Sequence, residues 1–268
     1  MPTVLVGDDT DLLILLLYHV DLNSKDVYFI PEPKGTSTKS RKWDIKTCKT
    51  KLGLEICSNL LFVHAVLGCD TTSRLYGIGK AAGLTKIQNN DDFQNIARVF
   101  LQDGVSKNDV IEAGERALVI LYGGDKGVGL DSLRYKRFQE KVVRSLKQVE
   151  ANTLPPTSGA AKFHSLRVYY QVQEWRGKSE LMKADDWGWK EVKGQLLPVK
   201  TDLPPAPEEL LRLFRCNCKT DCDTKKCTCK KHYLECNAAC GHCKGVSCFN
   251  SQKMLLQDDE DNETIDDK

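Results

Sequence analysis

The chain has 268 residues, and its 39 Lys and Arg nearly balance its 37 Asp and Glu, leaving a formal net charge of +2. Its 41% of hydrophobic residues suffices for one medium-sized domain and one small one, and no apolar run reaches the roughly 18 residues that a membrane-spanning helix needs. We therefore expect a soluble protein with no membrane partner. The net charge alone indicates no partner, because a basic cysteine-rich segment is offset by seven carboxylates between Asp258 and Asp267.

The first thirty residues predict one α/β unit with a parallel sheet. A short β-rich run, a Gly-Asp break, an apolar stretch of helical length and a second β-rich run follow one another, at Thr3–Val6, Gly7–Thr10, Asp11–Val20 and Asp26–Ile30. Acidic residues after the first strand would lie at the carboxyl end of the sheet, where α/β folds bind ligands. Asp9 and Asp11 are therefore candidates for holding Mg²⁺, and helix capping by Asp8 or Asp9 is the alternative.

A second stretch, His64 to Gly83, reads HAVLGCDTTSRLYGIGKAAG. With the acidic run GDDTDLL before it, this segment resembles flap-endonuclease-type (PIN-like) nucleases, in which a leucine-rich helix ends in L-G-x-D and a G-I-G hairpin follows. The resemblance implies that Asp9, Asp11 and Asp70 coordinate metal. It also implies that Gly77, Ile78 and Gly79, with Lys80 after them, contact DNA phosphates. The alternative is that G-I-G only ends a helix.

Hydrolysis is not expected from this polypeptide. In the resembled nucleases at least half of the metal-binding carboxylates come from upstream strands and helices, whereas eight residues precede Asp9. Two explanations stay open. The chain is a degenerate nuclease kept for binding, or it is an N-terminally incomplete product of a Mg²⁺-dependent, structure-specific nuclease.

The middle of the chain predicts a basic loop followed by helices. The loop spans residues 31 to 51, and Gly123 to Gly127 predicts a further loop without a nucleotide-binding motif. An aromatic turn at Trp187–Lys190 should precede a hairpin at Lys193-Gly194, and a proline-rich linker should follow. Apolar spacing predicts helices at Asp92–Leu101, Ser106–Tyr122, Leu130–Glu150, His164–Trp175 (capped by Thr157 or Ser158) and Pro207–Phe214.

Nine of the twelve cysteines fall within 33 residues, at Cys216, Cys218, Cys222, Cys227, Cys229, Cys236, Cys240, Cys243 and Cys248. Their odd number and the absence of an apolar signal peptide favour metal binding in a reducing compartment over disulfides. Each zinc ion takes four thiolates. Nine thiolates match three zinc ions without a remainder if three sulfurs each bridge two metals.

The spacing C-x-C-x3-C-x4-C-x-C-x6-C-x3-C-x2-C-x4-C resembles the tesmin-type CXC domain. That resemblance implies a cluster of three structural zinc ions and DNA binding. The chain departs from the pattern in having one copy, and Lys226 where the family has a tyrosine. A metallothionein-like store is an alternative that Tyr233 and Phe249 disfavour. A pre-SET cluster is another, but the twenty residues after Cys248 leave no room for a methyltransferase domain.

Lysines fill many gaps between the cysteines, and Lys225, Lys226, Lys230 and Lys231 are the candidates for contacting DNA phosphates. Simple solubility is the other explanation of these charges, and a protein-binding role of the acidic tail is a third functional hypothesis. The combination of a nuclease-like half, the segments LPPTS and WGW and one CXC module covers most of the chain and resembles mobile-element-derived proteins. We expect the protein in the nucleus, with protein partners unknown. The predicted parts are a truncated PIN-like α/β domain (1–150), a helical and aromatic connection (151–197), a linker with a short helix (198–214), a CXC zinc domain (215–251) and an acidic tail (252–268).

Overall fold

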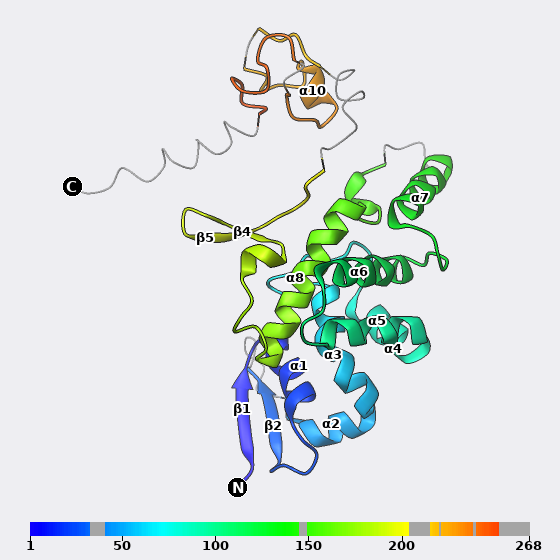
Figure 1. Ribbon diagram of the computed structural model, residues 1–268, viewed down its shortest axis with the longest axis vertical. Coiled ribbons are helices and arrows are strands. Elements are labelled where there is room, and N and C mark those ends of the chain that lie inside the picture. Colours follow the sequence, from blue (N-terminus) through cyan, green and yellow to red (C-terminus); the bar gives the residue numbers. More distant parts are fainter. Residues whose placement is uncertain (33–40, 145–148, 204–214, 220, 238–239, 252–268) are drawn as a thin grey trace, which may run out of the picture. The chain divides into compact units, whose positions relative to one another are not determined.

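The computed structural model describes residues 1–32, 41–144, 149–203, 215–219, 221–237 and 240–251. The chain divides into two compact units, residues 1–202 and residues 203–268. The first unit is a helix-rich α/β structure with two small sheets, and the second contains the cysteine cluster (Figure 1). The predicted domain limits at residues 150, 197 and 214 stay predictions. None of the described helices is both long and apolar enough to cross a membrane.

The N-terminal sheet has the predicted parallel pair at its centre. Strands β1 (Thr3–Gly7) and β2 (Val27–Pro31) run parallel, with Thr3 opposite Val27 and Gly7 opposite Pro31, and the two-residue strand β3 (Trp43–Asp44) pairs antiparallel to β2. Helix α1 (Thr10–His19) makes the crossover between β1 and β2. The parallel pair is confirmed, whereas the larger sheet of a PIN-like domain stays a prediction.

The basic segment between β2 and the leucine-rich helix is only partly a loop. Helix α2 (Ile45–Leu52) begins where the Asp44 side chain accepts a hydrogen bond from the Thr47 amide at 3.1 Å. Ile45 is buried, and the Lys49 ammonium donates to the Tyr18 and Val20 carbonyls. The predicted loop over residues 31–51 was therefore wrong from residue 43 onward, and residues 33–40 lie outside the described part.

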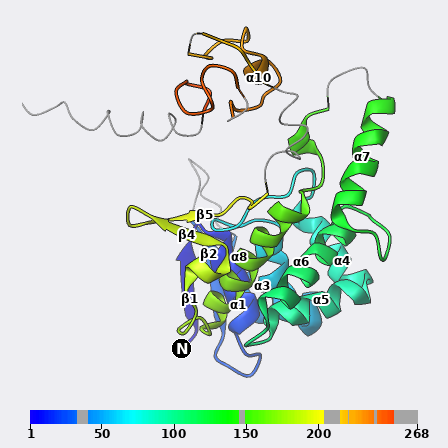
Figure 2. The same cartoon turned by 45° about the horizontal axis from the view of Figure 1, so that its top comes forward.

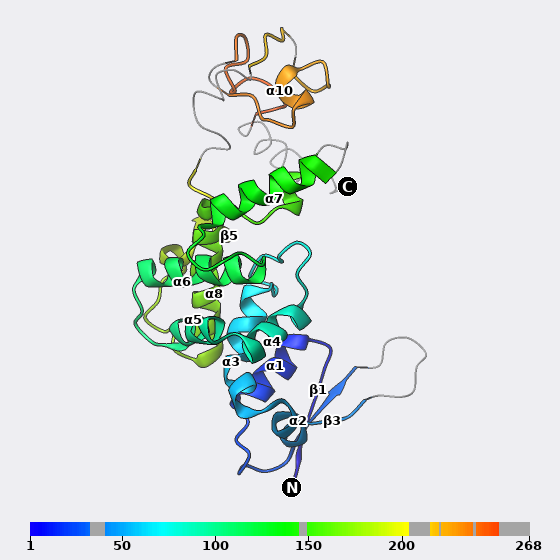
Figure 3. The ribbon, with the colours of Figure 1, turned by 90° about the vertical axis from the view of Figure 1, so that its right-hand side faces the viewer.

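A bundle of helices forms the larger core of the first unit. The bundle consists of α3 (Leu54–Val66), α4 (Lys80–Asn89), α5 (Asp91–Leu101), α6 (Lys107–Leu121), α7 (Leu130–Arg144) and α8 (Ser158–Arg176). In Figures 1 and 3, α8 runs beside α3, α5 and α6, and the β1–β3 sheet lies at the far end of the unit from α7. Helices α5 and α6 confirm their predictions. Helix α7 starts as predicted and residues 145–148 lie outside the described part, but the predicted end at Glu150 is wrong because residues 149 and 150 are not helical.

Helix α8 is longer than the predicted His164–Trp175. It starts after Thr157, whose hydroxyl accepts from the Ala160 amide, and ends at Gly177, which has a left-handed backbone. The Tyr169 hydroxyl and the Gln173 amide both donate to the Gln102 carbonyl at the end of α5. These bonds tie α8 into the core of the first unit.

The first unit ends in short elements, and the second unit contains little regular structure. The 3-10 turns η1 (Ala151–Thr153) and η2 (Ala184–Trp187) flank α8, and the predicted hairpin is confirmed by β4 (Trp189–Val192) and β5 (Gln195–Pro198), which Figure 2 shows clearly. The second unit has one described helix, the four-residue α10 (Thr228–Lys231). The predicted helix Pro207–Phe214 and the acidic tail lie outside the described residues.

Candidate metal centre

The nine clustered cysteines form the interior of the second unit. Eight of them are buried and Cys218 is half-buried, and the described hydrophobic core of this unit consists of these sulfurs alone. The apolar residues Tyr233, Val246 and Phe249 are exposed instead. Among the described residues, this unit therefore gains its interior from thiols rather than from aliphatic side chains.

The sulfur atoms lie at the separations expected around a tetrahedral zinc ion. Four thiolates at about 2.3 Å from zinc are about 3.8 Å from one another. The Cys216 sulfur is 3.8 Å from those of Cys222 and Cys236, and the Cys229 and Cys240 sulfurs are 3.5 Å apart. A disulfide needs about 2.05 Å, and all twelve cysteines of the chain are free thiols. The arrangement fits metal coordination better than cross-linking.

The nine sulfurs fall into four overlapping groups of four, with all ligand atoms of a group within 4.8 Å of one another. Cys216 and Cys236 each belong to three of these groups. The four groups are Cys216, Cys218, Cys222, Cys227; Cys216, Cys236, Cys240, Cys243; Cys216, Cys227, Cys229, Cys236; and Cys222, Cys236, Cys243, Cys248. A thiolate that belongs to several groups is placed to bridge metal ions. The cysteine cluster is thus suited to hold zinc, as the spacing predicted.

Polar groups around the sulfurs hold the turns in place. The Asn250 side-chain amide lies 3.4 Å from the Cys236 sulfur and donates to the Leu234 carbonyl at 3.0 Å. The Asn237 backbone amide lies 3.4 Å from the Cys240 sulfur. Such N–H···S bonds orient metal ligands and stabilise their negative charge. Neither asparagine is predicted by the cysteine pattern, and the one signal in the sequence is that each follows a cysteine of the cluster by one or two residues.

Two backbone positions in the cluster demand unusual conformations. Gly245 has a φ of 66°, and a Cβ there would lie 2.6 Å from the Cys236 carbonyl oxygen. Cys222 adopts a φ of 60°, which costs a non-glycine residue about 1–2 kcal/mol. Metal coordination by the Cys222 sulfur would offset that cost, since Cys222 belongs to two of the sulfur groups.

Burial and hydrogen bonding act in opposite directions on the thiols. Burial raises the pKa of the Cys216, Cys222 and Cys236 thiols well above the usual value. Burial also acts to raise the pKa of Cys243, but the Gly245 amide and neighbouring thiols outweigh it and lower this pKa to about 7. Binding a metal therefore requires that the ion displace protons from the more buried thiols, which makes metal affinity depend on pH.

The lysines of the second unit lie outside the sulfur interior. Lys225, Lys226 and Lys231 are exposed, and Lys230 is half-buried on α10. His232 and His242 are exposed as well. This distribution leaves the positive charges where a polyanion can reach them.

Two of the three aspartates predicted to bind Mg²⁺, Asp9 and Asp11, make other contacts in the first unit. Asp9 caps α1, and its carboxylate accepts from the Asp11 amide at 2.9 Å, which is the alternative that the sequence left open. Asp70 is exposed beyond the end of α3. Among the described residues, the groups of three or more ligand side chains that lie close enough to share an ion contain only cysteines. A Mg²⁺ site at Asp9, Asp11 and Asp70 stays a prediction.

Asp11 instead belongs to a polar cluster with the buried His64 and the exposed Lys80. The His64 Nε2 lies 2.5 Å from an Asp11 carboxylate oxygen, and the Lys80 ammonium lies 2.8 Å from His64 Nδ1. Burial lowers the pKa of His64, and the Lys80 charge adds to this effect, while the Asp11 hydrogen bond opposes it. A neutral imidazole that accepts from Lys80 and donates to Asp11 satisfies all three groups.

The G-I-G segment lies at the start of α4. Gly77 has a left-handed φ of 72°, and Gly79 is the residue before Lys80, the first residue of the helix. The segment therefore begins a helix rather than ends one. Its predicted role in DNA contact stays a prediction. His64 had received no role from the sequence, although a polar residue inside the apolar run LLFVHAV is unusual.

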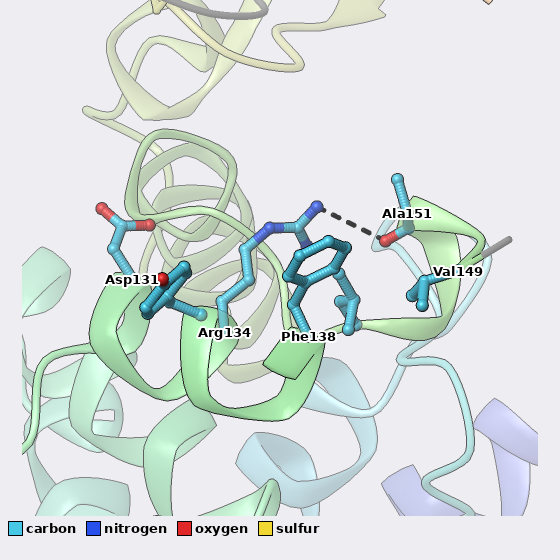
Figure 4. A pocket seen from close by; sticks show the side chains of 7 residues that line it. Asp131, Arg134, Phe138, Val149 and Ala151 are labelled. Carbon is cyan, nitrogen blue, oxygen red and sulfur yellow. Dashed lines mark hydrogen bonds between the residues drawn. The ribbon is translucent and has the colours of Figure 1, made fainter. Parts of the chain in front are cut away.

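A groove of about 360 Å³ lies beside α7 and is lined in part by Arg134, Phe138 and Ala151 (Figure 4). The Arg134 guanidinium donates to the Pro155 and Ala151 carbonyls across it. At its rim, the Asp131 carboxylate accepts from the Ser158 amide and hydroxyl at 2.9 and 2.6 Å. The charged groups thus connect α7 to the start of α8, and we assign the groove a structural role.

Comparisons of the chain with protein-family models, with curated proteins and with solved structures give no match. The resemblances to the CXC domain and to flap-endonuclease-type nucleases therefore rest on the motifs alone.

Proposed function

We propose that the second unit is a zinc-dependent DNA-binding module with three structural zinc ions in a nine-thiolate cluster. The observation that carries this proposal is the gathering of all nine sulfurs into overlapping groups of four. Three tetrahedral ions need twelve ligand positions, so three of the nine sulfurs must bridge. Cys216 and Cys236, which share most groups, are the best placed bridging ligands.

Charge supports DNA as the partner. Between Arg215 and Lys253 there are eight Lys and Arg and three acidic residues, a net charge of +5 before the metal cluster is counted. Four of the lysines are Lys225, Lys226, Lys230 and Lys231, of which three are exposed. Lysines in this arrangement neutralise phosphates and release counterions, so the affinity for DNA falls with salt. We expect such a module to act in the nucleus.

The test uses the full-length, zinc-loaded protein. Native mass spectrometry should find three zinc ions per chain, and fewer than two would contradict the cluster. If the four lysines each contact a phosphate, raising the salt from 50 to 200 mM should weaken duplex binding by about 100-fold. Lys231→Ala should reduce the salt slope by about one, whereas the exposed Lys244 in the matched variant Lys244→Ala should leave it unchanged. Binding that ignores salt would contradict the DNA proposal.

For the first unit we propose a nuclease-like scaffold that does not hydrolyse DNA. The support is the pairing of Asp11 with buried His64, which occupies one carboxylate oxygen that a metal ion would need. A branched duplex incubated with the protein and Mg²⁺ should stay intact. If the wild type instead cleaves the duplex and Asp11→Asn does not, the result would favour the Mg²⁺-dependent nuclease.

A further inference from the structure

Tyr233 occupies a backbone position at the end of α10 that favours glycine. Its φ is 57°, its amide donates to the Lys230 carbonyl at 3.1 Å, and the next amide, of Leu234, donates to the Cys229 carbonyl at 3.0 Å. These two bonds form a Schellman motif, in which the residue corresponding to Tyr233 adopts the left-handed conformation and is usually glycine. A tyrosine is conformationally costly there.

Packing does not compensate for this cost. Tyr233 is 76% exposed, and within the described residues its side chain has no ring partner or hydrogen bond. The other left-handed non-glycine residues of the described part differ from Tyr233 in their setting or side chain. Cys222 is a candidate metal ligand, Lys193 forms the turn of the β4–β5 hairpin, and Lys244 is an exposed polar residue before Gly245. Tyr233 combines strain with a large ring that faces solvent.

The charges near Tyr233 identify the chemistry of a ligand for this ring. Lys230 and Lys231 are the last two residues of α10, and Lys225 and Lys226 precede the same helix. Glu235 is the acidic residue nearest in sequence, which leaves the positive charges in excess. A ligand with both phosphates and flat apolar surfaces fits lysines that flank an exposed aromatic ring. Nucleic acids have this combination, and inorganic phosphate does not.

We propose that the Tyr233 ring stacks on an unpaired base of single-stranded DNA whose phosphates contact the neighbouring lysines. This inference rests on the proposed DNA-binding function and specifies its substrate class. Base faces in a duplex are covered by the adjacent bases, whereas an unpaired base offers its face to an aromatic side chain. The proposal explains why a strained, solvent-exposed tyrosine stands where glycine would form the same turn.

The test measures the affinity of full-length, zinc-loaded protein for a fluorescent single-stranded oligonucleotide of mixed sequence. Tyr233→Gly should weaken binding by about 5- to 100-fold, the range that loss of one base stack produces. Tyr233→Phe, which keeps the ring, should bind within about twofold of the wild type. Zinc transfer to a chromogenic chelator should be as slow in Tyr233→Gly as in the wild type or slower, because glycine suits the turn.

Phe249→Ala provides the matched control, since Phe249 is 48% exposed in the same unit but has an ordinary backbone conformation. It should bind single-stranded DNA like the wild type. The stacking proposal would be overturned, while DNA binding stands, if Tyr233→Gly bound single-stranded DNA as tightly as the wild type. It would also be overturned if Tyr233→Phe lost as much affinity as Tyr233→Gly. A loss on duplex as large as that on single strands would overturn the preference for unpaired bases. Absence of binding by the wild-type protein would overturn the proposed function itself.

Discussion

His164 is a buried imidazole whose protonation the fold opposes. It lies on α8, its Nε2 donates to the Val66 carbonyl at 3.0 Å, and its Nδ1 has no hydrogen-bond partner among the described residues. Burial, with a smaller contribution from Arg167, lowers the pKa of His164 from about 6.5 to about 4. Because a proton on Nδ1 would find no acceptor, the folded protein keeps this ring neutral.

The resulting pH dependence has a definite sign. Below pH 6.5 the unfolded chain binds a proton at this ring and the folded protein does not, so stability is complete above pH 6.5 and falls toward pH 4. We expect the first unit to lose about 2 kcal/mol of unfolding free energy between pH 7 and pH 5 from His164 alone. Tryptophan fluorescence in a urea titration measures this, since the four tryptophans, Trp43, Trp175, Trp187 and Trp189, all lie in the first unit.

The control is His164→Gln, whose amide can donate to the same carbonyl but does not titrate. Between pH 7 and pH 5, the unfolding free energy of this variant should fall by about 2 kcal/mol less than that of the wild type. His64, whose pKa is also lowered, should account for a further dependence of the same sign in both proteins. An unchanged pH dependence in His164→Gln would contradict the assignment.

Gly245 is the residue whose substitution should disturb the metal centre without removing a ligand. Its left-handed backbone disfavours any side chain, and an added Cβ would lie 2.6 Å from the backbone of Cys236 and Asn237. Gly245→Ala should destabilise the zinc-loaded unit by at least about 1 kcal/mol. Competition with a chromogenic chelator should show faster zinc loss. Lys244→Ala, at the adjacent exposed residue, should behave like the wild type, and equal zinc retention by both variants would contradict the steric argument.

For single residues, the sequence predicted the cysteine ligands but not the polar groups that orient them. The nine cysteines are recognisable from their number and spacing, because thiol coordination requires those residues. The bond of Asn250 to the Cys236 sulfur and the pairing of His64 with Asp11 depend on which turns bring distant segments together. Neither contact has a fixed spacing along the chain, so no motif indicates it.

Helices α6 and α8 pack closely because α6 has a glycine, Gly114, where it faces α8. A Cβ on Gly114 would lie 1.9 Å from the Ser165 hydroxyl oxygen and 2.4 Å from the Ser165 Cβ. Gly114→Ala should therefore destabilise the first unit by about 1–3 kcal/mol, despite the better helix propensity of alanine. Urea unfolding followed by tryptophan fluorescence provides the measurement. The exposed Glu112 of α6 supplies the control, since Glu112→Ala should change stability by less than about 0.5 kcal/mol.

The elements that the sequence missed are those in which tertiary packing outweighs local propensity. Helix α4 contains Gly83, which weakens a helical pattern, yet a Cβ there would lie 2.5 Å from a Leu67 methyl group, so the glycine allows close approach to α3. Helix α2 has only a narrow apolar stripe within a basic segment. Helices α5 and α6 were predictable because their wide apolar faces repeat at three and four residues.

On the scale of the whole molecule, the two units obtain their interiors from different chemistry. The first unit buries aliphatic and aromatic side chains along α3, α5, α6 and α8. In the described part of the second unit, the buried cluster is made of cysteines, and Ser251 is the other buried residue. The cysteine count predicted this contrast. The acidic and G-I-G motifs specify a local site and not the number of strands, so the extent of the N-terminal sheet could not be predicted from them.

Removal of zinc should consequently unfold one unit and spare the other. Without the ions, the described interior of the second unit consists of little more than cysteine side chains, and the folding free energy of such a site is largely that of metal binding. After chelation, we expect the nine cysteines of the second unit to react rapidly with iodoacetamide, counted by mass spectrometry. The three cysteines of the first unit, Cys48, Cys57 and Cys69, should react at their original rate, and the tryptophan fluorescence should not change.

Addition of zinc before alkylation provides the control, since it should restore protection of all nine cysteines together if the ions share bridging ligands. If Cys216 and Cys236, which each belong to three of the sulfur groups, bridge two ions, the loss of one ion would weaken the sites of the others. Partial chelation should therefore produce two populations, with nine protected or nine reactive thiols, and few chains between them. Stepwise exposure of four thiols at a time would contradict bridging and indicate separate zinc sites.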